Sequence, residues 1–172
     1  VTNATSLSAT LLYLPFDTNT SNVSNNGIKD YSGFENHGTL GWGNGSSSAP
    51  VWNSSGKIGG AYTFDGINDT INVTKSGTLN NTFNFSVDVW IRPDITSGTY
   101  YIFDNYAGGS VVNGNFLLYV NGNTINSFNE ASNNVVSSTI SANQWYHVAA
   151  VMTSGSNYKL YINGALNATD SV

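Results

Sequence analysis

Apolar and polar side chains alternate along almost the whole chain, and this period of two is typical of β-strands rather than helices. Val, Ile, Tyr, Phe and Thr are frequent in the alternating runs, while Gly, Asn and Ser separate them. No stretch has a convincing helical pattern. The sequence therefore predicts an all-β fold, with strands over residues 7–16, 60–66, 69–75, 83–93, 99–106, 114–122, 123–130, 135–140, 145–153 and 158–164.

Two Asn-Gly pairs predict tight hairpins between neighbouring strands, at Asn121–Gly122 and Asn163–Gly164. A two-residue type I′ turn needs positive φ at both central positions, and Asn and Gly adopt it at little cost. The flanking segments "LYVNGNTI" and "LYINGALN" are alike. We therefore expect two similar meander hairpins rather than a solenoid repeat.

The stretch "TFDGINDTINV", residues 63–73, alternates on both sides of a Gly-Asn-Asp turn. This pattern predicts a hairpin in which Phe64, Ile71 and Val73 face inward. Asn72 would then lie on the solvent side, where a bulky group is tolerated.

Composition limits the functions that the chain can have. With 172 residues, 40% apolar and 9% charged, it suits a single well-packed domain. A net charge of −5 and only 5 Lys plus Arg, with no basic run, exclude the row of phosphate contacts that nucleic acids require and disfavour an anionic membrane surface. The chain also has no apolar run near the roughly 20 residues of a membrane-spanning helix.

Glycosylation sequons are frequent in a chain that contains 26 Asn, 22 Ser and 17 Thr but no Cys. Such a composition produces many sequons by chance, so a merely Asn- and Thr-rich chain is the alternative. The high density of sequons favours an N-glycosylated, extracellular protein of a prokaryotic cell surface, such as that of an archaeon. The candidate glycosylation sites are Asn3, Asn19, Asn22, Asn44, Asn53, Asn68, Asn72, Asn80, Asn84 and Asn167.

Six segments occur in the order and spacing of a known family: "LYLPFD", "DYSGFENHGTL", "GKIGGAYTFDGINDTINV", "FSVDVWIRP", "WYHVAAV" and "YKLYINGAL". Together they cover residues 11 to 166, and the chain resembles the laminin-G-like, concanavalin-like jelly rolls. The resemblance implies a two-sheet antiparallel sandwich, which agrees with the strand pattern. We expect a single domain over residues 11–172, preceded by a leader over residues 1–10.

The resemblance departs from the family at the end of the chain, because members continue through further strands beyond the second hairpin. The leader "VTNATSLSAT" has the alternation of an extra strand. Residues 3–12 of one copy could complete the sheet of the next by strand addition. The alternative is that later residues of the same chain finish the sheet.

Catalytic chemistry is not expected from this sequence. A glycoside hydrolase needs two carboxylates across a groove, but Glu35 and Glu130 are the only glutamates, and neither lies in the strand pattern of the laminarinase-type relatives. His37 and His147 have no Cys and no nearby second His, which argues against a transition-metal site. We expect His147 simply to cap a half-buried strand beside Trp145.

Calcium is the metal that suits the loop chemistry best. The segment from 17 to 60 is rich in Ser, Gly and Asn, and loops of that length often hold an ion or a function. Within it, "DYSGFENHG" offers carboxylate, amide and backbone oxygens. The resemblance places Asp30 and Asn36 in the ligand positions of a structural Ca²⁺. The alternative is that both side chains form Asx-turns and bind no ion.

Two functions remain open. The first is a non-catalytic structural or adhesion module of a surface filament, sheath or stalk, which binds copies of itself or other surface proteins. The second is a carbohydrate-binding, lectin-like module that stacks sugars on aromatic side chains. Sequence alone does not separate core from exposed aromatics among Tyr100, Tyr101, Phe103, Tyr106, Tyr119, Trp145 and Tyr158.

Overall fold

A computed structural model describes residues 10–19, 27–43, 46–74, 79, 84–94, 97–105, 116–129, 134–153 and 157–171. The chain divides into two compact units, unit 1 (residues 1–80) and unit 2 (residues 81–172). A single domain over residues 11–172 therefore stays a prediction. No helix of the described residues is long and apolar enough to cross a bilayer.

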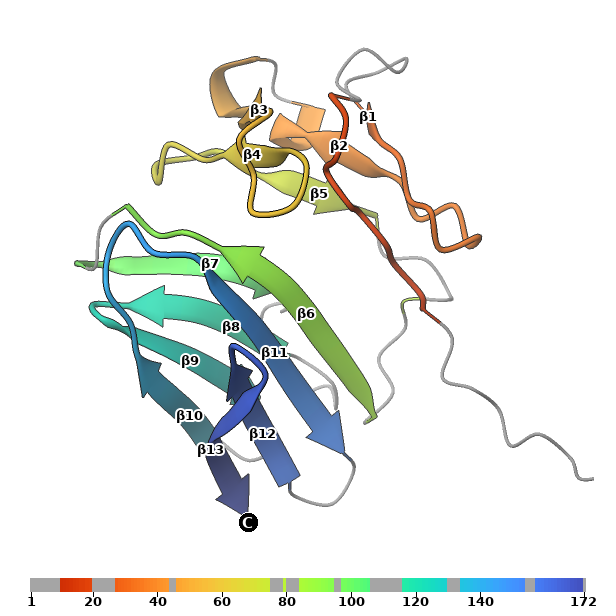
Figure 1. The fold of residues 1–172 in the computed structure, drawn as a ribbon. Coiled ribbons are helices and arrows are strands. Elements are labelled where there is room, and N and C mark those ends of the chain that lie inside the picture. Colours follow the sequence, from red (N-terminus) through yellow and green to blue (C-terminus); the bar gives the residue numbers. More distant parts are fainter. Residues whose placement is uncertain are drawn as a thin grey trace, which may run out of the picture. The chain divides into compact units, whose positions relative to one another are not determined.

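Unit 2 is a sandwich of two four-stranded antiparallel sheets (Figure 1). The first sheet has the order β10-β9-β8-β7, and the second has the order β13-β12-β11-β6. The edge strands β10 and β13 lie close together. The strands are β6 (Phe85–Ile91), β7 (Thr99–Asp104), β8 (Phe116–Asn121), β9 (Thr124–Asn129), β10 (Asn134–Thr139), β11 (Tyr146–Thr153), β12 (Asn157–Ile162) and β13 (Ala165–Ser171).

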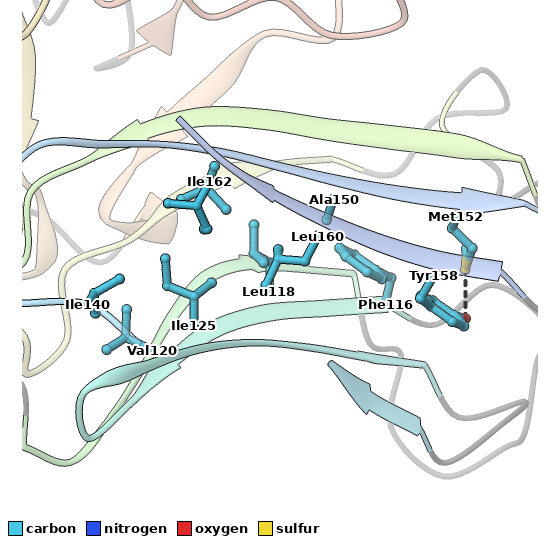
Figure 2. Close-up of a cluster of buried hydrophobic side chains, with 11 residues drawn as sticks. Phe116, Leu118, Val120, Ile125, Ile140, Ala150, Met152, Tyr158, Leu160 and Ile162 are labelled. Atoms are coloured by element: carbon cyan, nitrogen blue, oxygen red, sulfur yellow. Dashed lines mark hydrogen bonds between the residues drawn. The ribbon is translucent and has the colours of Figure 1, made fainter. Parts of the chain in front are cut away.

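The core of unit 2 lies between these two sheets, because every second residue of each central strand points inward. Leu118 and Leu160, from opposite sheets, are fully buried. Figure 2 shows the side chains of the two sheets facing one another, with the Tyr158 hydroxyl donating to Met152 Sδ at 2.9 Å. The buried cluster comprises Phe116, Leu118, Val120, Ile125, Ile140, Val148, Ala150, Met152, Tyr158, Leu160 and Ile162.

Both predicted hairpins of unit 2 form, but only one has the expected turn. Asn163 and Gly164 occupy the two loop positions between β12 and β13 with φ of 51° and 79°, as a type I′ turn requires. In the other hairpin Asn121 pairs with Thr124, so the loop residues are Gly122 and Asn123, and of these only Gly122 has positive φ. The first turn is therefore shifted by one residue, with the Gly-first pattern of type II′ turns.

Unit 1 is built from much shorter strands. One sheet has the order β1-β2-β5, with β1 (Gly27–Ile28), β2 (Gly38–Leu40) and β5 (Ile71–Val73). A separate ribbon pairs β3 (Val51–Asn53) with β4 (Ala61–Thr63). Two short 3₁₀ turns, η1 (Gly41–Gly43) and η2 (Ser46–Ser48), precede the ribbon.

The core of unit 1 is correspondingly small. Its buried members are Ile28, Leu40 and Tyr62. The Phe16 ring packs edge-on against Tyr62 at 5.2 Å between centroids. Trp52 Nε1 donates to the Phe16 carbonyl at 3.0 Å, directly beside Gly60. A Cβ at position 60 would lie 2.5 Å from that carbonyl oxygen, so glycine permits this close approach.

Four expectations for unit 1 are wrong. Residues 10–16, the described part of the expected strand 7–16, form no strand, and the expected loop 17–60 contains β1, β2 and β3. Residues 63–73 are not a hairpin, because β4 pairs with β3 while β5 pairs with β2. Phe64, expected inward, is 48% exposed. Strands of two or three residues are too short to show an alternating pattern in the sequence. Their pairing partners also come from distant segments, which local sequence does not indicate.

The fold class itself is confirmed. The described residues contain no α-helix, and the strands of unit 2 form the predicted two-sheet antiparallel sandwich.

Candidate functional site

Two tyrosines and an asparagine form a row across the outer face of the β7–β10 sheet. Tyr101 pairs with Tyr119, and Tyr119 pairs with Asn126, so the three side chains come from three adjacent strands. The tyrosine rings lie 5.9 Å apart between centroids, tilted by 47°. Tyr101 is 61% exposed, while Tyr119 is half-buried and Asn126 is buried. This row, Tyr101–Tyr119–Asn126, is called the tyrosine face below.

Hydrogen bonds hold the polar groups beside the tyrosine face. Asn126 Nδ2 donates to Thr124 Oγ1 at 2.9 Å, and Thr124 Oγ1 donates to the Asn121 carbonyl at 2.8 Å. Thr99 Oγ1 donates to Asn121 Oδ1 at 3.4 Å. These hydrogen bonds fix the side chains around the rings, while the Thr99 and Thr124 hydroxyl oxygens keep the capacity to accept a hydrogen bond from a ligand hydroxyl.

The Tyr119 phenol remains protonated at neutral pH. Burial raises its pKa above the usual value of 10.0, and the neighbouring Tyr101 raises it further. A protonated phenol both donates and accepts hydrogen bonds. The tyrosine face therefore combines apolar ring surface with uncharged polar groups.

A second group of side chains lies on the outer face of the other sheet. The His147 and Asp88 side chains join at 2.7 Å between Nε2 and Oδ2, and the Trp90 ring packs against the His147 ring at 5.2 Å between centroids. Trp90 is 37% exposed. Strand pairing places Trp90 opposite His147. The expected role of His147 as a cap beside Trp145 is replaced by this contact with Trp90 and Asp88.

Asp30 and Asn36 are adjacent in unit 1, as predicted, and both are buried. The Asp30 carboxylate accepts hydrogen bonds from the backbone amides of Tyr13, Ser32 and Asn36 at 2.8 to 2.9 Å, and from Ser32 Oγ at 2.6 Å. Asn36 Nδ2 donates to the Leu11 carbonyl at 2.7 Å. Burial acts to raise the pKa of Asp30, but these hydrogen bonds lower it below its usual value of 3.8.

Hydrogen bonds within unit 1 already occupy the Asp30 carboxylate. The four hydrogen bonds use about as many directions as a carboxylate can accept from. Among the described residues, no three His, Cys, Asp or Glu side chains gather where they could hold a metal. The bond from the Ser32 amide to Asp30 is an Asx-turn, the alternative considered for this loop. Calcium binding by Asp30 and Asn36 stays a prediction, and the observed donor set fits it poorly.

The remaining titratable residues that the sequence singled out are dispersed. Glu35 is exposed, and Glu130 lies outside the described residues. His37 Nδ1 accepts the Asp30 amide at 3.1 Å, next to the Asx-turn. Asp65 accepts the amides of Ile67, Asn68 and Asp69 within its own turn.

Six of the ten sequon asparagines fall in the described residues, and their positions differ in access. Asn72, expected on the solvent side, is half-buried in β5. Asn84, between two phenylalanines, is exposed. The other exposed positions are Asn19, Asn53, Asn68 and Asn167. The sites outside the described residues are Asn3, Asn22, Asn44 and Asn80.

The structure also sorts the aromatic residues that the sequence left open. Tyr158 is buried in the core of unit 2, and the partly buried Phe103 packs against that core. Tyr101 and Tyr119 face outward, and Tyr106 lies outside the described residues. Sequence reasoning missed Asp88, Trp90 and Asn126. The alternation in "FSVDVWI" carried a signal for the first two, since it places Asp88 and Trp90 on the face opposite the core.

Comparison with known proteins places this fold. Residues 64–172 match the family model described as the concanavalin A-like lectin/glucanases superfamily. No curated protein matches the chain. Similar solved structures include the binding domain of botulinum neurotoxin serotype G, with a TM-score of 0.65 and 19% identity over 84% of this chain and 36% of that chain.

Two further structures are similar. One is of botulinum neurotoxin type C, whose cell entry depends on interaction with two ganglioside molecules. It has a TM-score of 0.58 and 20% identity over 86% of this chain and 36% of that chain. The other is the binding domain of Paraclostridial Mosquitocidal Protein 1, with a TM-score of 0.57 and 19% identity over 84% of this chain and 38% of that chain. The chain thus spans little more than a third of each, and the likeness is one of fold.

Proposed function

Because this chain belongs to the concanavalin A-like lectin/glucanases superfamily, we propose that it is a non-catalytic carbohydrate-binding module and that its sugar lies on the tyrosine face. The observation that carries the proposal is the exposure of Tyr101 beside Tyr119 on the outer face of the sheet. An exposed aromatic ring in a fixed position stacks on the apolar face of a sugar ring, while neighbouring hydroxyl and amide groups bind its hydroxyls.

Two features of the site support this role. Tyr119 and Asn126 are held by burial and by strand pairing, so little conformational entropy is lost when a ligand binds. A relative in fold, botulinum neurotoxin type C, interacts with gangliosides, which are glycolipids that carry sialic acid. This likeness supports glycan binding by the fold and does not indicate which sugar the tyrosine face takes. The tyrosine face differs from a catalytic groove, because its described residues contain no pair of facing carboxylates.

A glycan array probed with the full chain tests this function. We expect binding to at least one glycan, and Tyr101→Ala should weaken it between about twofold and tenfold, since one aromatic contact is worth about 0.5 to 1.5 kcal/mol. Trp90→Ala is the matched control, because it removes an exposed aromatic from the opposite sheet. No binding, or equal losses in both variants, would contradict the proposal.

We also propose that the module works outside the cell and carries N-linked glycans. The exposed sequon residues Asn19, Asn53, Asn84 and Asn167 support this, because a glycan there displaces no packed side chain. Peptide mass spectrometry of native material should find glycan on several of them. Bare asparagines at all four positions would end the proposal.

Assembly into a filament, sheath or stalk by strand addition stays a prediction. Residues 3–9 of the donated segment lie outside the described residues. The C-terminal end of this segment is bound within its own chain, because the Leu11 carbonyl accepts hydrogen bonds from Ser32 Oγ and Asn36 Nδ2. Deleting residues 1–10 should leave an unassembled, less stable product if the strand is donated, and unchanged assembly would argue against donation.

A further inference from the structure

We infer that the tyrosine face takes an uncharged glycan and discriminates against glycans that carry carboxylate or sulfate groups. This inference rests on the proposed function and specifies its ligand class. Three observations carry it: the charge of the strands that build the face, the position of Asp104, and the kind of donor that the face offers.

The sheet that carries the tyrosine face has no positive charge. Strands β7, β8, β9 and β10 contain neither Lys nor Arg, and their only charged residue is Asp104. Of the described cationic residues in unit 2, Lys159 belongs to β12 in the opposite sheet and Arg92 follows β6 in that sheet. An acidic sugar bound here would therefore lack the charged partner that carboxylates and sulfates usually find in proteins.

Asp104 lies on the same outer face as the tyrosines. It pairs with Leu117, which is two residues from Tyr119 in β8, and side chains two residues apart in a strand share a face. A register shift after Tyr101 keeps both Tyr101 and Asp104 exposed. Diagonal neighbours in a sheet are about 7 to 8 Å apart. That spacing is within the Debye length of about 8 Å at physiological salt, so the carboxylate repels a bound anion.

The donors on the face suit hydroxyl groups better than anions. The donors that the face offers to a ligand are the phenol hydroxyls of Tyr101 and Tyr119, which are uncharged. The Thr124 hydroxyl and the buried Asn126 amide, also uncharged, donate within the sheet. Strand pairing on both sides of β8 and β9 uses their backbone amides within the sheet. An anion that loses water here gains only neutral hydrogen bonds, which is unfavourable. A neutral sugar hydroxyl exchanges hydrogen bonds with water at little net cost.

Matched glycans test the inference. The full chain is measured at low and physiological salt against an array of neutral glycans, each paired with its sialylated or sulfated derivative at the terminal sugar. We expect the neutral member of each bound pair to bind about tenfold more tightly or better, with the gap widening at low salt. Equal or tighter binding of the acidic members overturns the inference and leaves the proposed function intact. Binding of neither member refutes both.

A substitution identifies the source of the discrimination. Asp104→Asn removes the negative charge and keeps the shape, so we expect it to narrow the neutral-to-acidic ratio severalfold at low salt. Asp88→Asn is the matched control, because it removes an exposed carboxylate from the opposite sheet and should leave the ratio unchanged. An unchanged ratio in Asp104→Asn, or an equal change in both variants, would contradict the assignment to this face.

Discussion

In unit 2 the strands are six to eight residues long and two sheets enclose eleven buried side chains, whereas no described strand of unit 1 exceeds three residues and its buried cluster has three members. Unit 1 is instead held by side chains that bind backbone groups, above all Asp30 and its four donors. One chain, rich throughout in small polar residues, therefore uses two means of ordering itself. We therefore expect the stability of unit 2 to fall when a core side chain is shortened. The stability of unit 1 should instead depend on the charge of Asp30 and on pH.

The largest expected effect is in the core of unit 2. Leu160 is fully buried between the sheets, so Leu160→Ala should reduce the free energy of unfolding by about 2 to 5 kcal/mol, because a cavity adds to the lost apolar burial. Urea denaturation of the full chain measures this loss. Leu166→Ala is the control, since Leu166 is exposed on the same sheet and should change stability by less than about 0.5 kcal/mol. Similar losses in the two variants would contradict the placement of the core.

A smaller and more local effect is expected in unit 1. Asp30→Ala leaves three backbone amides and one hydroxyl without their acceptor. Only the bond from the Asn36 amide is fully buried, so we expect a loss of about 1 to 3 kcal/mol, the cost of one unsatisfied buried group. Hydrogen exchange should accelerate in residues 27–40 and stay unchanged in residues 146–162. Asp65→Ala, at an exposed turn, should have less effect. Uniform acceleration across both units would refute a local role.

The same carboxylate should make unit 1 sensitive to acid. Hydrogen bonds lower the pKa of Asp30 in the folded state, so its contribution to stability is fully present above its usual, unfolded pKa of 3.8 and is lost as the pH falls through the lowered folded pKa. Comparison of the full chain with Asp30→Asn by hydrogen exchange should show a difference at pH 6 that shrinks below pH 4. If the difference in exchange between the two proteins grew as the pH fell, the pKa of Asp30 would not be lowered in the folded state, and the prediction would be wrong.

The smallest effect concerns backbone strain in unit 1. Trp42 has φ of 50° and ψ of 27°, a left-handed conformation that is unfavourable for a bulky residue, and its side chain is exposed. Trp42→Gly should stabilise the chain by about 1 kcal/mol, because glycine adopts this conformation without a Cβ clash. Trp42→Ala removes the same ring but keeps the strain, so it should gain less. Equal thermal melts for the two variants would exclude strain as the cause.

The sequence predicts the outward position of Tyr119 on the tyrosine face but not that of Tyr101. Alternation in "FLLYVN" places Tyr119 opposite the buried Leu118 and Val120, so its outward position was predictable. In "TYYIFD" alternation alone would put Tyr101 and Phe103 on one face, but the register shift between them turns Tyr101 outward and leaves Phe103 against the core. A register shift depends on the pairing with β8, which local sequence does not encode.

By itself, the sequence determined the all-β class, the existence of both hairpins in unit 2, the Gly-Asn-Asp turn over residues 66–69 and the absence of positive charge from strands β7 to β10. Each of these depends on residues that are neighbours in the chain. Tertiary structure decided which partner each short strand takes, which tyrosine reaches solvent and how Asp30 is satisfied. The donors to Asp30 come from segments up to 17 residues away, and Tyr101 meets Tyr119 across two strands. Such contacts form only when distant segments pair, since the free energy that selects them comes from burial and hydrogen bonding of the whole sheet rather than from local propensity.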